Sequence, residues 1–155
     1  MQTLEQLIAA SPVFAGLAEE QLAVIAGCAV NERFDAGSEL FREGRPADRF
    51  YLIREGAIAL EVEAPGRGRL VVQTLHAGEV AGWSWLFEPY LWEFDGRAHE
   101  PTKVVGFDGA CLRGKCEADH ELGFQLMRRF AASMTERLQA TRLQLLDVYG
   151  GARGE

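Results

Sequence analysis

The sequence has no apolar run close to the roughly 18 residues that a membrane-spanning helix needs. Its first residues also lack the basic start of a signal peptide, since Glu5 stands among them. Basic residues are too few to balance the acidic ones, because 16 Lys and Arg stand against 23 Asp and Glu and the net charge is -7. That sign disfavours general DNA binding through phosphates. We expect a cytoplasmic protein that does not associate with membranes.

Cysteine is also scarce, and the three cysteines are too few and too odd in number for a disulfide framework. We therefore expect buried or half-buried thiols in a reducing compartment. Cys111, Cys116 and His120 lie near one another in the sequence, which leaves a metal or redox sensor as an alternative. Cys28 would have to supply a further ligand, and zinc sites usually have closer ligand pairs, so we expect no bound metal.

Catalytic motifs are absent from the sequence as well. It contains no P-loop, no dinucleotide-binding fingerprint, no nucleophile elbow and no HExxH motif. His76 and His99 have no evident catalytic companion. These observations predict a protein that is not an enzyme.

The organisation that is present fits one domain, because 155 residues suffice for a single core. We place this domain at residues 1–149 and a flexible tail at residues 150–155. Residues 3–29 show helical spacing of apolar residues. From about residue 30 to 108, short β-branched and aromatic segments alternate with glycine, which is typical of a small antiparallel barrel or roll.

One hairpin is particularly clear within this region. Residues 57–63 alternate between apolar and other side chains, which predicts a strand with one face exposed to water. Residues 65–68 have the composition of a turn, and residues 70–75 form the returning strand.

Residues 121–149 carry the pattern of one long amphipathic helix, with Asp119 as its N-cap. Such a helix is about 43 Å long, whereas a domain of this size is about 30 Å across. The projecting apolar stripe favours a homodimer, although the helix folding entirely onto its own roll is the alternative. The interface candidates are Phe130, Met134, Leu138, Thr141, Leu145 and Val148.

A series of short motifs occupies most of the chain between Ser11 and Val148. They are PVFAGL from Pro12, FDAG from Phe34, LFREG from Leu40, FYLIREG from Phe50, GEVAG from Gly78, VGFD from Val105 and MTERLQAT from Met134. In order and spacing they resemble the cyclic-nucleotide-binding domain of the Crp/Fnr regulators and of cyclic-nucleotide-gated kinases and channels. The resemblance implies a mainly β fold: an eight-stranded β-roll of the jelly-roll type with N-terminal helices and a long C-terminal dimerisation helix.

The resemblance also implies a phosphate-binding cassette, and the sequence departs from the family pattern there. In the family, a Glu after the cassette glycine holds the ribose, and an Arg further along holds the cyclic phosphate. Here Trp83 follows Gly82, and Trp92 or Glu93 stands at the position of the Arg. Because Glu93 and Asp95 would repel a phosphate, we expect a degenerate cassette and no cofactor. A cyclic nucleotide remains the alternative ligand.

Six aromatic side chains, including all three tryptophans, lie in residues 83–94. They can fill the pocket from within, which would leave the domain without a ligand. They can also line a flat apolar cavity for another small molecule, or form the seam where this segment docks on the long helix.

Four further residues are candidates for a pocket. Arg97 is either a displaced phosphate ligand or an ordinary strand residue. The resemblance places Thr141 where the long helix offers a polar group to the base, with Arg142 next to it and Arg137 one turn earlier; the alternative is that Thr141 is a small residue in a helix seam. The full set of pocket candidates is Gly82, Trp83, Ser84, Trp85, Trp92, Glu93, Phe94, Arg97, Arg137, Thr141 and Arg142.

In the transcription-factor branch, residues 145–148 would lead into a winged helix-turn-helix, and the sequence stops there instead. We therefore expect no DNA binding by that route. The function we predict is a stand-alone regulatory or accessory domain that acts through contacts with an unknown protein partner. The alternative is a small-molecule sensor that binds a cyclic nucleotide or another planar ligand.

Overall fold

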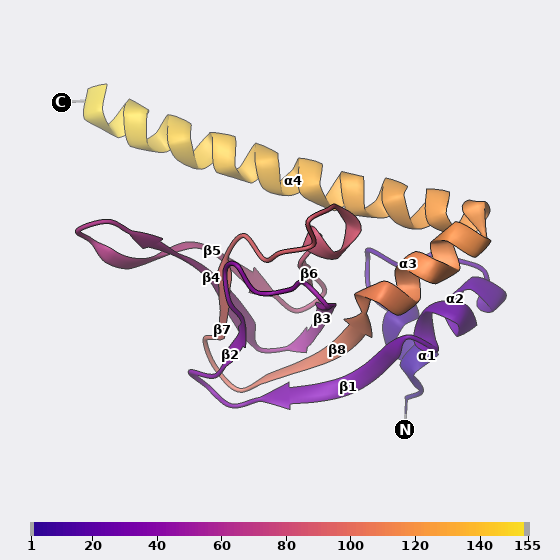
Figure 1. Cartoon of the computed structure of the whole chain (residues 1–155). Coiled ribbons are helices and arrows are strands. Elements are labelled where there is room, and N and C mark those ends of the chain that lie inside the picture. The colour runs from indigo at the N-terminus through magenta and orange to yellow at the C-terminus, as the bar shows by residue number, and fades with distance from the viewer. Residues whose placement is uncertain (1, 154–155) are drawn as a thin grey trace.

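Two four-stranded antiparallel sheets form a β-roll in the computed structural model, which describes residues 2–153 (Figure 1). One sheet has the strand order β1-β8-β3-β6 and the other β2-β7-β4-β5. The strands are β1 (Ala29–Phe34), β2 (Glu39–Phe41), β3 (Arg49–Glu55), β4 (Ala57–Ala64), β5 (Gly68–His76), β6 (Val80–Ala81), β7 (Asp95–Ala98) and β8 (Thr102–Asp108). The expected eight-stranded roll is confirmed.

The predicted hairpin is β4 and β5, which pair along their whole length from Ala57 with His76 to Ala64 with Gly68. A glycine is required just before it. Gly56 has φ +94°, and a Cβ at this position would lie 2.6 Å from the carbonyl oxygen of Pro101. Only glycine therefore lets the chain pass from β3 to β4 so close to the neighbouring backbone.

Two hydrophobic cores hold the roll together. One lies inside the roll and is centred on side chains of β2, β3 and β4, with Phe41, Ile58 and Leu60 among them. The other lies between the first sheet and the helices, and includes Phe50 and Phe130. Trp85 belongs to the core beneath the helices and Trp92 to the core inside the roll. The segment of residues 83–94 is therefore anchored in both cores.

Four helices accompany the roll. They are α1 (Leu4–Ala9), α2 (Glu19–Ala26), α3 (Gly109–Ala118) and α4 (His120–Arg153), and a short 3-10 helix, η1 (Ser84–Leu86), lies between β6 and β7. The helical N-terminal region is confirmed. Helix α3 was not predicted, because its sequence has little amphipathic character and two glycines, Gly109 and Gly114.

Helix α4 begins as expected, since Oδ1 of Asp119 accepts hydrogen bonds from the backbone N–H groups of Glu121 and Leu122. It continues to Arg153, so residues 150–153 are helical and the predicted tail is wrong for them. The remaining residues of that predicted tail, 154–155, lie outside the described residues. The 34 residues of α4 correspond to a helix length of about 51 Å.

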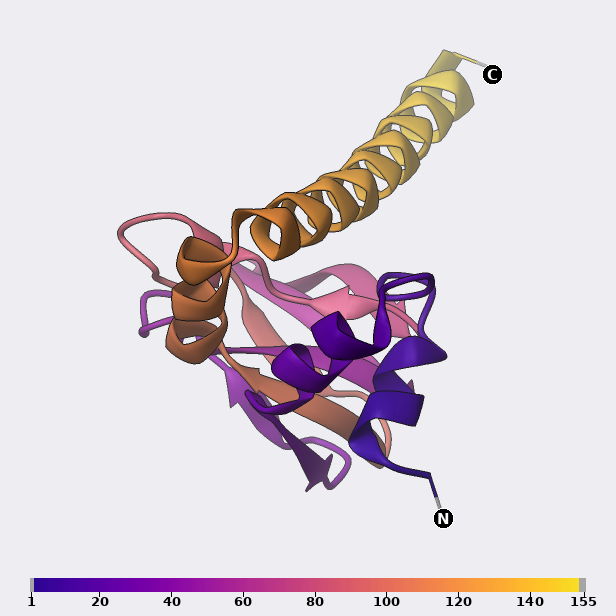
Figure 2. The same cartoon turned by 90° about the vertical axis from the view of Figure 1, so that its right-hand side faces the viewer.

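The length of α4 carries it well past the roll. Its first half packs over the roll, and its second half projects in the same direction as the β4–β5 hairpin (Figures 1 and 2). Along residues 2–153, no helix combines the length and the apolar character needed to cross a bilayer.

Candidate functional site

The segment between β6 and β7, which the sequence identifies as the cassette, is attached to the connection between β2 and β3. The N–H of Trp92 donates to the carbonyl of Arg45 at 2.9 Å, and the N–H of Gly44 donates to the carbonyl of Trp92 at 2.8 Å. The N–H of Ala47 donates to the carbonyl of Tyr90 at 2.7 Å. These backbone hydrogen bonds attach residues 90–92, the returning half of the cassette, to the connection between β2 and β3.

Trp92 fills the inside of the roll. Its indole stacks on Phe41 with 3.7 Å between ring centroids and 7° between planes, and the residue is only 7% exposed. A Cβ at Gly82 would lie 2.6 Å from the tip of the indole, so the ring reaches the start of the cassette. Trp92, one of the two residues that the sequence predicts at the phosphate-anchor position, is therefore a core residue in this protein.

Inside the roll, the space that remains at the cassette is small, whereas a separate pocket of about 130 Å³ lies between the outer side of the cassette and Met134 of α4. A cavity of about 20 Å³ is bounded by Gly82, Trp83, Ser84, Phe94 and Arg137, with Phe41, Leu60 and Trp92 as its floor. That volume is enough for about one water molecule. Pockets for small ligands usually measure some 300–1,000 Å³.

Trp85 belongs to the second core. It is fully buried on η1, stacks on Phe50 at 4.6 Å between centroids, and meets the edge of Phe130 of α4 at 5.5 Å. Gly109 of α3 lies against it, since a Cβ there would be 2.8 Å from Trp85 Cβ. The structure thus uses one tryptophan inside the roll and another as the seam between cassette and α4, which are two of the interpretations that the sequence left open.

The third tryptophan, Trp83, is half-buried and contacts a buried cation. The guanidinium of Arg137, from α4, lies 4.8 Å from the centroid of the Trp83 ring and donates to the carbonyl of Val80. Arg137 is 9% exposed, and burial lowers its pKa while nearby Glu79 opposes that shift. Among the described residues, no carboxylate oxygen lies within 4.0 Å of this guanidinium.

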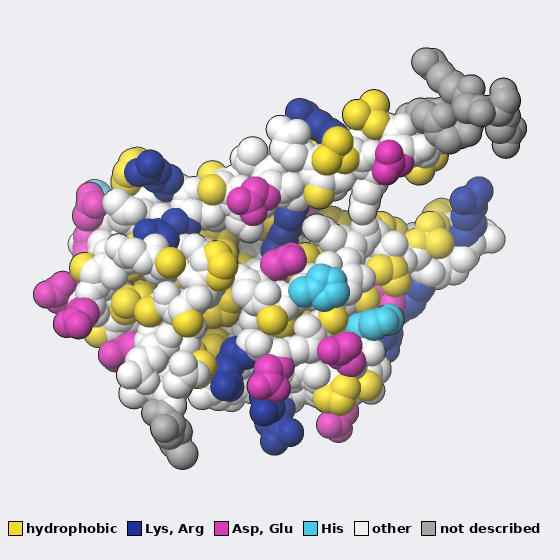
Figure 3. Space-filling view, turned by 180° about the vertical axis from the view of Figure 1, so that it is seen from behind, with side chains coloured by type: hydrophobic (Ala, Val, Ile, Leu, Met, Phe, Trp, Pro, Cys, Tyr) yellow, Lys and Arg dark blue, Asp and Glu magenta, His cyan; other side chains and the backbone are white. Residues whose placement is uncertain are grey.

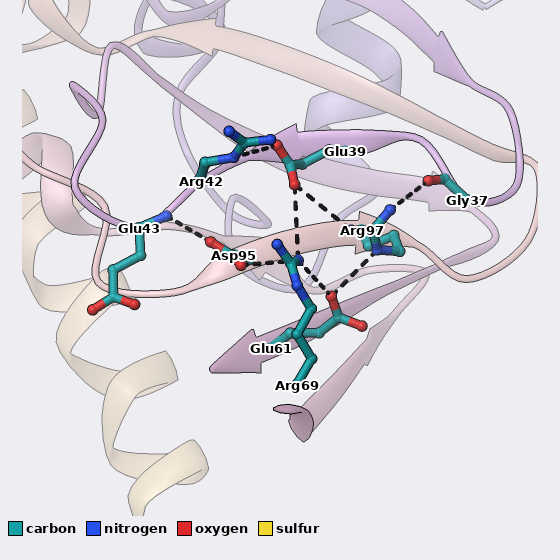
Figure 4. Close-up of polar contacts among 8 residues, drawn as sticks. All are labelled: Gly37, Glu39, Arg42, Glu43, Glu61, Arg69, Asp95 and Arg97. Carbon is teal, nitrogen blue, oxygen red and sulfur yellow. Dashed lines mark hydrogen bonds and ion pairs between the residues drawn. The ribbon is translucent and has the colours of Figure 1, made fainter. Parts of the chain in front are cut away.

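Arg97 lies in β7 and points to the outer face of the roll, away from the cassette cavity. Its Nε is 3.3 Å from Oε1 of Glu61, its Nη2 is 3.6 Å from Oε2 of Glu39, and its Nη1 donates to the carbonyl of Gly37 at 2.8 Å (Figure 4). Because the neighbours of Arg97 in β7 pair with the inward-facing Ile58 and Leu60, strand alternation explains its direction. The side chain is committed to this surface and does not reach the cavity.

The same surface holds further ion pairs. Arg69 of β5 lies 3.0 Å from Asp95 and 3.4 Å from Glu61, and Oδ1 of Asp95 also accepts from the N–H of Glu43 (Figure 4). Ala59, which pairs with Arg97, is buried although its strand pattern predicted an exposed face. Sequence reasoning missed this cluster because its members come from β2, β4, β5 and β7.

The remaining pocket candidates divide between the cavity and the surface. Ser84 and Phe94 line the cavity, whereas Glu93 is exposed. Thr141 is on the exposed part of α4, and its hydroxyl donates to the carbonyl of Arg137 at 2.9 Å within the same helix. Arg142 is exposed as well. Of the three α4 residues proposed to complete a pocket, only Arg137 lines the cavity.

The projecting half of α4 carries exposed apolar side chains. Phe130 lies in the protomer's own core and Met134 is half-buried, whereas Leu138 is 51% and Val148 69% exposed, and Leu145 is also exposed. Figure 3 shows such side chains along α4 and on the nearby hairpin. The exposed large apolar residues of that hairpin are Leu70, Val71 and Val72.

The expected free thiols are wrong for two of the three cysteines. Cys28 and Cys111 form a disulfide, with 5.8 Å between their Cα atoms, and Cys116 is the free thiol. The bond also takes Cys111 away from the metal site considered with Cys116 and His120. It could not be foreseen because 83 positions separate the two cysteines, and pairing of β1 with β8 brings them together. Because of this disulfide, the small number of cysteines no longer supports the prediction of a reducing compartment.

Comparison with known proteins decides the family. The profile of the cyclic nucleotide-binding domain family matches residues 31–119, more than half of the chain. The chain belongs to this family. A crystal structure described as a cyclic nucleotide-binding protein from Geobacter metallireducens is 34% identical, with a TM-score of 0.79 over 89% of this chain and 99% of that one.

More distant relatives are regulators by their names. A CRP-like cAMP-activated global transcriptional regulator from Mycobacterium tuberculosis is 23% identical over 145 residues, which are 94% of this chain. The chain spans 63% of the length of that regulator. The catabolite activator protein of Thermus thermophilus is 22% identical, with a TM-score of 0.70 over 90% of this chain and 63% of that one, and this likeness shows the shared fold.

Proposed function

We propose that this member of the cyclic nucleotide-binding domain family is a regulatory domain whose cassette is closed by its own aromatic side chains, and which acts through protein–protein contacts. The observation that carries the proposal is the indole of Trp92, stacked on Phe41 inside the roll. Trp92 is, with Glu93, one of the two residues that the resemblance places where the family pattern has a phosphate-binding arginine.

Space and charge both support a closed cassette. The cavity of about 20 Å³ is far smaller than a ligand of nucleotide size. The one cation that lines it, Arg137, already bonds the carbonyl of Val80 and faces the ring of Trp83. A cyclic phosphate would therefore have to displace an aromatic core residue and find an anchor that the cassette does not offer.

The exposed apolar side chains support an output through protein contacts. Leu138, Leu145 and Val148 follow one another along the projecting half of α4, and the hairpin with its exposed apolar residues projects in the same direction (Figure 1). A contiguous exposed apolar surface marks an interaction site in a protein of this kind. A second copy of the chain covers it best, because two such helices pack along a common stripe and form a homodimer.

The proposal includes no catalytic step and places the protein in the cytoplasm. The named Mycobacterium tuberculosis relative is a transcriptional regulator, and such proteins work in the compartment that holds the DNA. Besides the second copy of the chain, the domain would contact an effector protein of unknown identity.

A titration of the full chain with cyclic AMP and cyclic GMP to millimolar concentration tests the closed cassette. Trp83, Trp85 and Trp92 are all of the tryptophans, and all lie in the cassette, so intrinsic fluorescence reports on it directly. We expect emission equal to that in a parallel titration with 5′-AMP at matched absorbance. Calorimetric binding of cyclic AMP or cyclic GMP in the micromolar range would show that the proposal is wrong.

The second candidate function is a sensor for a small planar anion. It is favoured by the buried guanidinium of Arg137, because buried charges are ordinarily paired with an opposite charge. Its ligand would enter between Trp83 and Ser84 as Trp92 moves aside. This function predicts saturable quenching by an aromatic carboxylate such as benzoate, lost in Arg137→Gln; the closed cassette predicts no saturable quenching.

A further inference from the structure

The disulfide between Cys28 and Cys111 links the segment that follows α2 to the start of α3. Cys28 lies between Gly27, the C-cap of α2, and the start of β1, and Cys111 lies in the first turn of α3. A hydrogen bond from the N–H of Asp108 to the carbonyl of Cys28 runs beside it at 2.8 Å. The bond therefore fixes the start of α3 to the end of the N-terminal helices.

Helix α3 is the support on which the cassette rests. Nη1 of Arg113 donates to the carbonyl of Trp85, and its guanidinium lies 4.1 Å from the centroid of the Tyr90 ring. Gly109, at the first position of α3, packs against Trp85. A displacement of α3 would therefore be transmitted to η1 and to the returning half of the cassette.

The same helix also leads into α4. Only Asp119 separates the two helices, and Gly123 of α4 packs against Cys116 of α3. The position of α3 thus sets the start of α4, whose projecting half carries the exposed apolar surface. The Cys28–Cys111 disulfide therefore holds α3, and α3 positions both the cassette and α4.

The two cysteines of this bond differ in how far each residue is exposed to solvent. Cys28 is 6% exposed, whereas Cys111 is half-buried at the surface of α3. Burial, with Asp119 and Glu117 adding to it, raises the pKa of the remaining thiol, Cys116, which disfavours its thiolate as an internal attacking group. Of the two bonded cysteines, the more exposed Cys111 is the one that an external thiol would reach.

We propose that the Cys28–Cys111 disulfide is a thiol-exchange site, at which small-molecule thiols of the glutathione class release α3 from α2 and so loosen the cassette. The proposal rests on the cytoplasmic placement proposed above, because disulfides in reducing compartments are usually transient and redox-sensing. The site lies outside the cassette cavity, and its chemistry needs no bound nucleotide.

The exchange proceeds in two balanced steps. The thiolate of a first thiol attacks Sγ of Cys111, the bond between the two protein sulfurs breaks, and Sγ of Cys28 leaves as a thiolate and takes up a proton. A second thiol, as its thiolate, then attacks the external sulfur of the mixed disulfide and releases Cys111, whose thiolate is protonated. The protein disulfide gains two electrons, and the two small thiols lose two electrons as they become a disulfide.

The test follows the native protein in buffers of reduced and oxidised glutathione. Alkylation and intact mass should count one free thiol in the oxidised chain and three in the reduced chain. We expect reduction in native buffer at a rate proportional to thiol concentration and well above the rate of global unfolding. Amide hydrogen exchange should then rise several-fold in residues 84–92 and stay unchanged in the β4–β5 hairpin.

Matched variants separate the parts of the proposal. The double variant Cys28→Ser/Cys111→Ser should show the reduced exchange pattern in every buffer, while Cys116→Ser should keep the full response. Reduction that occurs only at the rate of global unfolding would identify a purely structural bond and overturn the proposal. So would equal exchange of residues 84–92 in both redox states. Binding of cyclic AMP would refute the closed cassette and leave these thiol measurements as they are.

Discussion

At the scale of single residues, the identity of position 92 has the largest consequence for the site. Trp92 lies at the return of the cassette, and its ring completes the core inside the roll together with Phe41. The indole is thus part of the folded structure rather than of an open pocket. Removing the side chain of Trp92 should therefore lower the stability of the folded protein.

Trp92→Ala should lower the free energy of unfolding by about 3–5 kcal/mol, the usual cost of deleting a large aromatic side chain from a core. Denaturant unfolding followed by circular dichroism measures the change. The neighbouring Leu91→Ala, at an exposed position, is the control and should cost less than about 1 kcal/mol. Similar losses for the two variants would contradict the packing described for Trp92.

Gly82 allows the indole to reach its place. The residue has φ +105°, and a Cβ there would come within 2.6 Å of the Trp92 ring. Gly82→Ala should lower the unfolding free energy by roughly 3 kcal/mol, from backbone strain and overpacking together. Gly44→Ala is the matched control, because Gly44 has φ +84° with nothing near its Cβ position and should lose only about 1 kcal/mol. Thermal and chemical unfolding of both variants measures the difference.

At the scale of elements, the strands and the long helix were predictable because their signals are local. The alternation of residues 57–63 and the turn after them predicted β4 and its partner β5, and both are confirmed. Helix α3 and the cassette's attachment to the β2–β3 connection were not predicted. Each depends on contacts between segments distant in sequence, such as the hydrogen bond from Trp92 to Arg45.

The N-cap of α4 gives a prediction at this scale. Oδ1 of Asp119 accepts hydrogen bonds from two backbone N–H groups at the start of α4, so Asp119→Ala should cost about 1 kcal/mol of unfolding free energy. Asp119→Asn keeps an acceptor oxygen and should lose only a few tenths of that amount. Urea unfolding of the two variants checks this, and an equal cost for both would indicate that the charge, and not the cap, matters.

At the scale of the whole molecule, we expect the surface of α4 and the hairpin to determine how the chain associates. A homodimer predicts a mass near twice 17.1 kDa in light scattering at micromolar concentration. Leu138→Glu should shift this mass to that of one chain, because the substitution places a charge in the apolar stripe. A single-chain mass for the unaltered protein would contradict the proposed dimer.

The control for this variant is Leu143→Glu. Leu143 is also exposed on α4, and at 100° per residue it lies about 140° around the helix from Leu138. The same chemical change on the other face should leave the dimer intact. Dissociation by both variants alike would show that the association does not use the Leu138 stripe.

The sequence by itself determined the roll and the long helix, because periodicity and turn glycines are written locally along the chain. From residue identity it also predicts the loss of both charged anchors in the cassette. Only the tertiary structure decided where the side chains of that segment go: Trp92 into the roll, Trp85 into the seam with α4, and Arg97 onto the outer face. It also decided the bond between Cys28 and Cys111. The physical reason is that burial and covalent pairing depend on neighbours supplied by distant strands and helices, and the spacing of residues along one segment does not encode which neighbours those are.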